Sequence, residues 1–154
     1  MIIQTGELRE QDRRYTGEEP VSILELEHDP MIRDGSPVRY DLHAQRLMDD
    51  MLVRGTLAVE FTSPCSRCGE WFRKSLRVST FFRSYPLAHE NESIDLTGDI
   101  REDILLALPI NLVCSAECRG VCPQCGVNLN KQSCGCHPGK SPAAWSVLDQ
   151  LKLT

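Results

Sequence analysis

Three stretches in the middle of the chain alternate between apolar and polar residues with a period of two, as half-buried β-strands do. The first stretch, 38–45, has one apolar parity: Val38, Tyr40, Leu42 and Ala44. The second stretch, 51–61, repeats the pattern with Met51, Val53, Leu57, Val59 and Phe61. Gly55 interrupts the second run and is a candidate β-bulge. The pattern predicts antiparallel strands with one face on a core.

A third alternating run covers 72–83. Its expected inner parity carries Phe72, Leu76, Val78 and Phe82. Its expected outer parity carries Arg73, Ser75, Arg77, Ser79, Phe81 and Arg83. The turn between the second and third runs contains Cys65 and Cys68, so we expect a hairpin with two thiols at its tip.

Further elements are expected on either side of these runs. The segment 21–27, bounded by Pro20 and by Asp29-Pro30, indicates a short strand. Asp99 followed by Glu102 indicates a capping box that starts a helix, which Pro109 ends. Its expected buried stripe is Ile100, Ile104, Leu105 and Leu108. Ser141-Pro142 indicates the start of a short C-terminal helix with an apolar side of Trp145, Leu148 and Leu151.

The length of 154 residues fits one domain, or one domain with a small appendage. No apolar run approaches the ~18 residues that span a bilayer, and the N-terminus has no basic region followed by an apolar one. We therefore expect a cytoplasmic protein that is neither membrane-bound nor classically secreted, with its eight cysteines kept reduced.

The cysteines form four close pairs: Cys65/Cys68, Cys114/Cys118, Cys122/Cys125 and Cys134/Cys136. Two pairs have the form Cys-x-x-Cys-Gly, which lets two sulfurs reach one ion from a tight turn. The glycine supplies the positive φ that closes the turn. Four thiolates around an ion favour Zn²⁺ in a closed, non-catalytic site. All eight cysteines are therefore candidate zinc ligands, for two ions.

The four pairs can be grouped around two ions in three ways. Loop closure favours Cys122/Cys125 with Cys134/Cys136, leaving Cys65/Cys68 to join Cys114/Cys118. The two Cys-x-x-Cys-Gly turns could instead face each other as a zinc ribbon. In the third solution Cys114, Cys118, Cys122 and Cys125 surround one ion. We expect the first arrangement, in which metal binding supplies folding energy to a segment with few apolar residues.

Other interpretations of the cysteines are disulfides, a redox pair, an iron–sulfur cluster or unused buried thiols. A reducing compartment argues against disulfides. Neither Cys-x-x-Cys opens a helix after a parallel strand, as a thioredoxin-like site would. Hairpin-like knuckles suit zinc better than a cluster. His137 follows Cys136 directly and is an alternative ligand.

The formal net charge is −5, and eight thiolates with two zinc ions would take it to −9. RNA binding would therefore need a local basic surface. Candidate RNA-binding residues on the third run are Arg73, Lys74, Arg77, Phe81 and Arg83. Arg119 is a further candidate RNA-binding residue and forms a second small basic cluster with Lys131. The alternative is a solvated sheet face whose arginines pair with carboxylates such as Glu60.

Catalytic signals are weak. The sequence has no Gly-rich phosphate loop, no Ser-His-Asp arrangement supported by spacing, and no carboxylate pair in an apolar setting. We expect no enzyme and no small-molecule substrate.

Together these features predict an α+β fold. We expect an antiparallel β-sheet of about four or five strands with one packed helix and a Cys-rich, zinc-stapled C-terminal segment. Residues 1–113 would form the α+β core domain. Residues 114–154 would form the zinc-binding segment with the short C-terminal helix.

Four stretches in this order resemble the YceD family, also called the large ribosomal RNA subunit accumulation protein. They are 61–72 (FTSPCSRCGEWF), 94–109 (IDLTGDIREDILLALP), 118–130 (CRGVCPQCGVNLN) and 141–152 (SPAAWSVLDQLK). The resemblance covers roughly residues 20 to 152. It implies a bacterial or plastid-type protein that supports accumulation of 23S ribosomal RNA and large-subunit biogenesis.

The resemblance also bears on the cysteines. Some family members that lack the downstream group keep ligand-type residues at the positions of Cys65, Cys68, Cys114 and Cys118. That pattern favours the same pairing as loop closure does. No catalytic residues follow from the resemblance, because none is established for the family.

The leading functional hypothesis is a non-enzymatic ribosome-biogenesis factor that binds 23S rRNA or its precursor, or a large-subunit ribosomal protein or assembly factor. The alternative is a zinc-stabilised adaptor that recruits an rRNA-processing factor without touching RNA. A more distant alternative is a thiol-redox sensor whose metal release reports oxidation.

Overall fold

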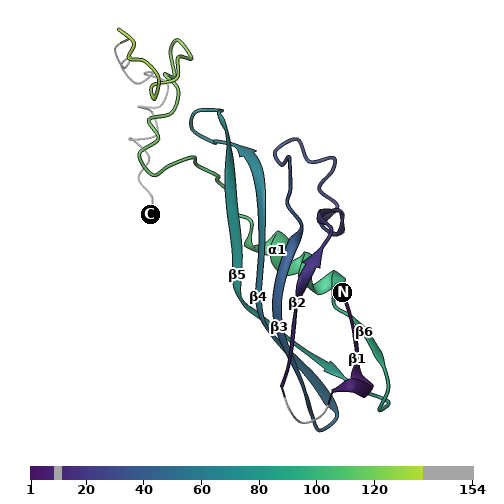
Figure 1. The fold of residues 1–154 in the computed structure, drawn as a ribbon. Coiled ribbons are helices and arrows are strands. Elements are labelled where there is room, and N and C mark those ends of the chain that lie inside the picture. Colours follow the sequence, from purple (N-terminus) through teal and green to yellow (C-terminus); the bar gives the residue numbers. More distant parts are fainter. Residues whose placement is uncertain (9–11, 137–154) are drawn as a thin grey trace, which may run out of the picture.

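A computed structural model describes residues 1–8 and 12–136. A four-stranded antiparallel sheet forms its body, in the order β2–β3–β4–β5 (Figure 1). Its strands are β2 (Arg13–Glu19), β3 (Val38–Leu47), β4 (Asp50–Pro64) and β5 (Trp71–Pro86). A second antiparallel sheet pairs β1 (Ile2–Gln4) with β6 (Ser93–Asp95). The other elements are the 3₁₀-helices η1 (Thr5–Glu7) and η2 (Val21–Leu24) and the helix α1 (Thr97–Ala107).

The core lies on one face of the four-stranded sheet. The small sheet, η2 and α1 cover that face, where Leu42, Leu57, Ile100 and Ile104 are almost fully buried. The opposite face carries no helix in the described part of the chain (Figure 1). One side of the sheet is therefore a packed interior, and the other is a surface of exposed strand side chains.

The predicted α+β class is confirmed: residues 1–8 and 12–136 contain an antiparallel sheet, one α-helix against it, and a Cys-rich segment after the helix. The strands expected at 38–45, 51–61 and 72–83 all form, as parts of β3, β4 and β5. Figure 1 shows the Cys-rich segment, the yellow-green end of the chain, at the tip of the β4–β5 hairpin and away from the small sheet.

A β-bulge changes the facing of β5 halfway along. Leu57 pairs with Val78, but Gly55 pairs with Phe81, so two residues of β5 oppose one of β4. A Cβ at Gly55 would overlap the backbone carbonyl of Asp41 on the neighbouring strand, which explains why glycine occupies that position. The predicted bulge at Gly55 is confirmed, but its effect on β5 was not foreseen.

Because of the bulge, the expected assignment of β5 side chains to the inner and outer faces of the sheet is wrong after Val78. Phe81 was expected on the outer parity and is only 1% exposed, whereas Phe82 was expected inside and is 56% exposed. Because side chains alternate strictly along a strand, one extra residue exchanges the two faces for everything that follows it.

Two other sequence expectations are wrong. The expected strand at 21–27 is the 3₁₀-helix η2 followed by a turn, and the strands β1 and β2 in the polar N-terminal region were missed. The expected capping box is absent: α1 begins at Thr97, two residues before Asp99, and its N-cap Leu96 makes no side-chain cap bond. Asp95 accepts hydrogen bonds from the backbone N–H and hydroxyl of Thr97 instead.

Two expectations lie outside the described residues. These are the alternative ligand role of His137 and the C-terminal helix with Trp145, Leu148 and Leu151. None of the helices in the described part of the chain has the length and apolar character that a bilayer crossing requires.

Candidate metal centres and basic face

The turn between β4 and β5 meets the segment after α1 at four cysteines. Cys65 and Cys68 come from the turn, and Cys114 and Cys118 from the segment that follows the helix. Their four sulfur atoms lie within 4.8 Å of one another. Cys65, Cys68 and Cys118 are buried, and Phe72 and Val113 pack against them. We call this set the hairpin cluster.

The sulfur separations fit a tetrahedral ion. The Sγ atoms of Cys65 and Cys118 are 3.8 Å apart, and those of Cys68 and Cys114 are 3.9 Å apart. Four sulfurs at the usual Zn–S distance of about 2.3 Å would be about 3.8 Å from each other. A disulfide would need about 2.05 Å, and all eight cysteines are free. The donor set therefore could hold a metal ion.

A second set of four, which we call the loop cluster, lies entirely within residues 122–136. It consists of Cys122, Cys125, Cys134 and Cys136, again with all sulfurs within 4.8 Å of one another. Cys122 is buried, but Cys125 and Cys136 are exposed. The structure thus assembles the grouping that loop closure favoured, and the described residues form neither the ribbon arrangement nor the third grouping.

The two Cys-x-x-Cys-Gly turns share one backbone geometry. In the hairpin cluster the N–H of Gly69 bonds the carbonyl of Cys65, and in the loop cluster the N–H of Gly126 bonds that of Cys122. Both glycines have φ of +74°, a conformation that favours residues without a Cβ. The two turns share the sequence Cys-x-x-Cys-Gly and therefore also share the structure of one knuckle.

Backbone N–H groups point at the first sulfur of each knuckle. Burial disfavours the Cys65 thiolate, but hydrogen bonds from backbone N–H groups, including those of Cys114 and Arg67, outweigh it and lower the pKa of this thiol to about 6. Donors from Cys125 and Gln124 likewise lower the pKa of Cys122 to about 6. Such donors stabilise negative sulfur, as they do around structural metals.

One thiol from the second half of each cluster behaves in the opposite way. The neighbouring Cys118 sulfur raises the pKa of Cys114 to about 12, and Cys125 raises the pKa of Cys136 to about 12. Four thiolates this close repel each other, so without a cation some must keep their protons. A divalent cation is the group that would let all four ionise together.

One side chain braces the hairpin cluster from within, and another joins it to the loop cluster. The Arg67 guanidinium donates to the carbonyls of Ala116 and Cys118, both at 3.2 Å. The Asn130 amide donates to Cys118 Sγ at 3.4 Å, and its carbonyl oxygen accepts from the N–H of Arg119. Sequence reasoning missed both Arg67 and Asn130, although each lies inside a Cys-containing motif.

An ion pair on the surface adds a further link between the two clusters. Lys131 Nζ lies 2.6 Å from the carboxylate of Glu70, which directly follows the first knuckle. The Asn128 amide also donates to that carboxylate, at 3.4 Å. Lys131, expected in a basic cluster with Arg119, therefore has its charge paired.

The outer face of the four-stranded sheet carries the predicted basic residues Arg73 and Arg77. Arg73 faces Thr62 and Arg77 faces Ala58 across the β4–β5 pair. The side chain of Arg73 is 71% exposed, and a carboxylate oxygen of Glu60 is 4.0 Å from its guanidinium. Glu60 also approaches Arg39 at 3.8 Å. The expected pairing with Glu60 thus exists, but as long, exposed contacts.

Two predicted members of the basic surface lie elsewhere. Because of the bulge, Phe81 faces the core, and Arg83 contacts α1 through ion pairs with Asp99 at 3.1 Å and Asp103 at 2.5 Å. The expectation that these two side chains lie on the exposed outer face of the sheet is therefore wrong. Lys74 alternates with Arg73 and points to the other face of β5. Arg119 is exposed beside the loop cluster.

An aromatic residue that sequence reasoning did not assign completes the outer face. Trp71 starts β5 next to the knuckle and is 40% exposed. The Arg33 guanidinium lies over its ring, 4.0 Å from the centroid. Arg33 pairs through its backbone with Thr62, which also faces Arg73. We call Arg33, Arg39, Trp71, Arg73 and Arg77 the basic face.

Known proteins share parts of this sequence. The family model "Large ribosomal RNA subunit accumulation protein YceD" matches residues 83–152. An uncharacterized protein of Mycobacterium tuberculosis is 30% identical over 134 residues, which cover 78% of this chain and 64% of the relative. The Arabidopsis thaliana "Large ribosomal RNA subunit accumulation protein YCED homolog 1, chloroplastic" is 23% identical over 159 residues, 77% of this chain and 50% of the relative.

A maize protein of the same printed name is 41% identical over 49 residues, 31% of this chain and 17% of the relative. The chain thus spans 64% of the mycobacterial relative and half of the Arabidopsis one. No solved structure matches. On these matches the chain is similar to the YceD family over residues 83–152, and two of its relatives carry that family's name.

Proposed function

We propose that this chain is a YceD-family protein and a non-enzymatic factor that binds large-subunit ribosomal RNA, 23S or its precursor, and thereby supports accumulation of the large subunit. The observation that carries the proposal is the basic face, where exposed arginines lie along neighbouring strands and the Arg33 guanidinium lies over the exposed ring of Trp71 next to a knuckle. The printed name of the Arabidopsis relative supports the choice of large-subunit RNA.

The chemistry of the basic face suits single-stranded RNA. Arginine side chains neutralise phosphates, and an exposed aromatic ring stacks on bases of any identity. Trp71 already has Arg33 on one side of its ring, so an arriving base would extend an existing stack. Arg73 and Arg77 lie along the same strand two to six residues away, a spacing that follows an extended backbone.

The metal in this proposal is zinc, with one ion in each cluster. Tetrathiolate sets with sulfur separations near 3.8 Å suit Zn²⁺, and a closed set of four ligands leaves no position for catalysis. The ion in the hairpin cluster would hold the start of β5, and therefore Trp71, in place. Native mass spectrometry of the purified chain would report two zinc ions, and one or none would contradict this assignment.

RNA binding is tested by removing charge from the basic face. In Arg73→Gln/Arg77→Gln, affinity for a labelled single-stranded fragment of 23S rRNA should fall, and the slope of log K against log salt should decrease by about 0.7 for each phosphate that is no longer neutralised. The matched control is Arg101→Gln, because Arg101 lies on α1 and pairs with Glu25. Binding that is insensitive to salt, or unaffected by the double variant, would contradict the proposal.

The stacking role is tested separately. Trp71→Ala should weaken binding by about 1–3 kcal/mol with little change in the salt slope, because a base loses its aromatic partner while phosphate contacts remain. In cells lacking the gene, the ratio of 23S to 16S rRNA should fall. The intact protein should restore it, and the Arg73→Gln/Arg77→Gln variant should not.

The second candidate is a protein-interaction adaptor that never touches RNA. The observation in its favour is the apolar surface at the end of α1, where Leu106 is 76% exposed and Ile110 is 99% exposed. Leu106→Ser/Ile110→Ser would then abolish large-subunit rRNA accumulation, while Arg73→Gln/Arg77→Gln would leave that accumulation unchanged.

A further inference from the structure

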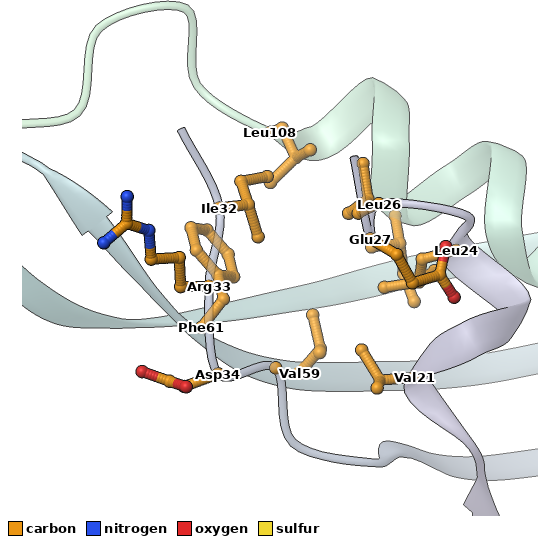
Figure 2. A pocket seen from close by; sticks show the side chains of 12 residues that line it. Val21, Leu24, Leu26, Glu27, Ile32, Arg33, Asp34, Val59, Phe61 and Leu108 are labelled. Atoms are coloured by element: carbon orange, nitrogen blue, oxygen red, sulfur yellow. The ribbon is translucent and has the colours of Figure 1, made fainter. Parts of the chain in front are cut away.

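An open apolar groove lies between the loop after η2, strand β4 and the end of α1. Its volume is about 370 Å³. Val59 and Phe61 of β4 form one side, and Ile104 and Leu108 at the end of α1 form another. Figure 2 shows the side chains of Leu26, Ile32 and Leu108 turned toward the same space, with the charged ends of Arg33 and Asp34 turned away from it.

The groove is continuous with the hydrophobic core, and its outer residues are only partly covered by other parts of the described chain. Its inner residues Leu24, Val59, Phe61 and Ile104 are buried, whereas Val21, Leu26, Ile32 and Leu108 are only partly buried and pack against them. An apolar cleft continuous with a core attracts an apolar side chain, because each square ångström removed from water contributes about 25 cal/mol.

The chain contains a segment of matching chemistry outside the described residues. Residues 137–154 follow Cys136, and their sequence places Trp145, Leu148 and Leu151 at the i, i+3, i+6 spacing of one helix face. The residues between these positions are mainly polar, including Ser146, Asp149 and Gln150. A single apolar stripe of this width needs a complementary groove rather than a full core.

The segment is long enough to reach the groove. Lys131 is fixed against Glu70 at the hairpin turn by their 2.6 Å ion pair. Phe61 lies four residues before Cys65 on β4, about 13 Å along the strand. The nine residues from Cys136 to Trp145 extend to about 30 Å. This span exceeds the path from the hairpin turn to Phe61 by about 17 Å, which is the length available between Cys136 and the hairpin turn.

The charges agree with this placement. Glu27 and Asp34 are the acidic residues that line the groove, against one basic residue, Arg33, whose guanidinium is stacked on Trp71. The segment carries Lys140 before its apolar stripe and Lys152 after it. A helix lying along the groove would bring a lysine to each end of an acidic rim.

We propose that the C-terminal segment 141–152 docks intramolecularly in this groove, with Trp145 inserted between β4, the loop after η2 and α1. Docking would tie the chain beyond the loop cluster back to the sheet. It would also cover the apolar side chains of Leu26, Ile32 and Leu108. This proposal is independent of RNA binding.

The first test uses photo-crosslinking in the full-length, metal-loaded chain. With p-benzoylphenylalanine introduced at position 145, irradiation should give crosslinks within one chain to peptides that contain 21–35 or 104–108, identified by mass spectrometry. The same probe at position 47, where the exposed Leu47 ends β3, should give none of them. Crosslinks only between chains would show that a second copy takes the groove, and would overturn intramolecular docking.

The second test uses tryptophan fluorescence. The chain has two tryptophans, so Trp71→Phe leaves Trp145 as the single emitter. Its emission should be blue-shifted and several-fold less quenched by acrylamide than that of a free 137–154 peptide. Adding Leu26→Lys should restore the quenching of the free peptide, whereas Leu47→Lys should not. Full quenching before any groove substitution, or protection that survives Leu26→Lys in a folded chain, would overturn the proposal.

Discussion

The hairpin cluster and the loop cluster use the same knuckle in opposite settings. In the hairpin cluster, three of four cysteines are buried and the ligands join parts of the chain about 45 residues apart. In the loop cluster, two cysteines are exposed and all ligands fall within fifteen residues. One motif therefore occurs in two settings: the first joins a long hairpin to the segment after a helix, and the second lies within a loop that has little core.

Both clusters offer four cysteine sulfurs, yet they differ in the length of chain between the ligands and in burial. The type of ligand alone therefore does not determine which part of the chain a bound metal would stabilise. Closing a long loop restricts the unfolded chain more than closing a short one does. Burial shields three of the four cysteines of the hairpin cluster from solvent and leaves only Cys114 exposed. In the loop cluster both Cys125 and Cys136 are exposed. The two sites are expected to differ in metal exchange and in their effect on the sheet.

The largest expected effect comes from removing all metal. Structural zinc contributes on the order of 10 kcal/mol or more to folding in small thiolate domains. Chelation should abolish hydrogen-exchange protection at the N–H groups of Cys122 and Leu129, whose bonds lie in the loop cluster, and spare Thr62 in the sheet. The loop cluster should release its ion first. Simultaneous loss from both clusters would remove the distinction between them.

A single ligand substitution in each cluster gives the next largest effect. Cys65→Ser and Cys125→Ser should each lower the metal content by one ion. Cys65→Ser should also lower the melting temperature of the sheet by several degrees, about 2–4 °C for each kcal/mol lost, because Cys65 anchors the hairpin. Cys125→Ser should leave that transition almost unchanged. Differential scanning calorimetry separates these outcomes, and equal shifts would contradict the assigned roles.

Asn130→Ala probes the contact between the clusters. Loss of its hydrogen bond to Cys118 should weaken metal binding in the hairpin cluster by about tenfold, as is typical for partners that orient metal ligands. A competition titration with a chromogenic chelator measures this change. The control is Gln132→Ala, since Gln132 bonds through its backbone N–H. An unchanged affinity would show that Asn130 stabilises only the loop around it and not the metal ligands of the hairpin cluster.

Glycine-to-alanine variants compare the two knuckles directly. Gly69→Ala and Gly126→Ala should each cost about 1–2 kcal/mol from the positive φ alone, because a Cβ at either position meets no atom within 4 Å. Gly120→Ala should cost more, since its Cβ would also lie 3.1 Å from the Arg67 carbonyl oxygen. Chemical denaturation measures all three. Unequal costs at Gly69 and Gly126 would show that the two turns are not equivalent.

The sequence allowed prediction of the features that depend on local pattern. Alternation located β3, β4 and β5, and the spacing of the cysteines led to the grouping that the structure contains. Both signals are short-range: a strand period is two residues, and loop closure favours the nearest partners.

The features that could not be predicted depend on contacts between distant residues. Gly55 marked a bulge, but which residues of β5 would lie opposite it depends on pairing, so the facing of Phe81 and Arg83 was assigned wrongly. β2 is a polar edge strand whose residues, such as Arg14 paired with Asp41 of β3, interact by charge and give no apolar alternation. Trp71 gained significance only once Arg33 was found on its ring.

The length of the β4–β5 ribbon has a mechanical consequence. Pairing runs from Asp50 and Pro86 at one end to Pro64 and Trp71 at the other, about 45 Å at the usual rise per residue. The sulfur-rich tip therefore sits at the end of a lever whose base is anchored by the small sheet. A rotation of a few degrees at the base displaces the tip by several ångströms. Contacts that hold the base therefore determine where the cysteine-rich tip lies.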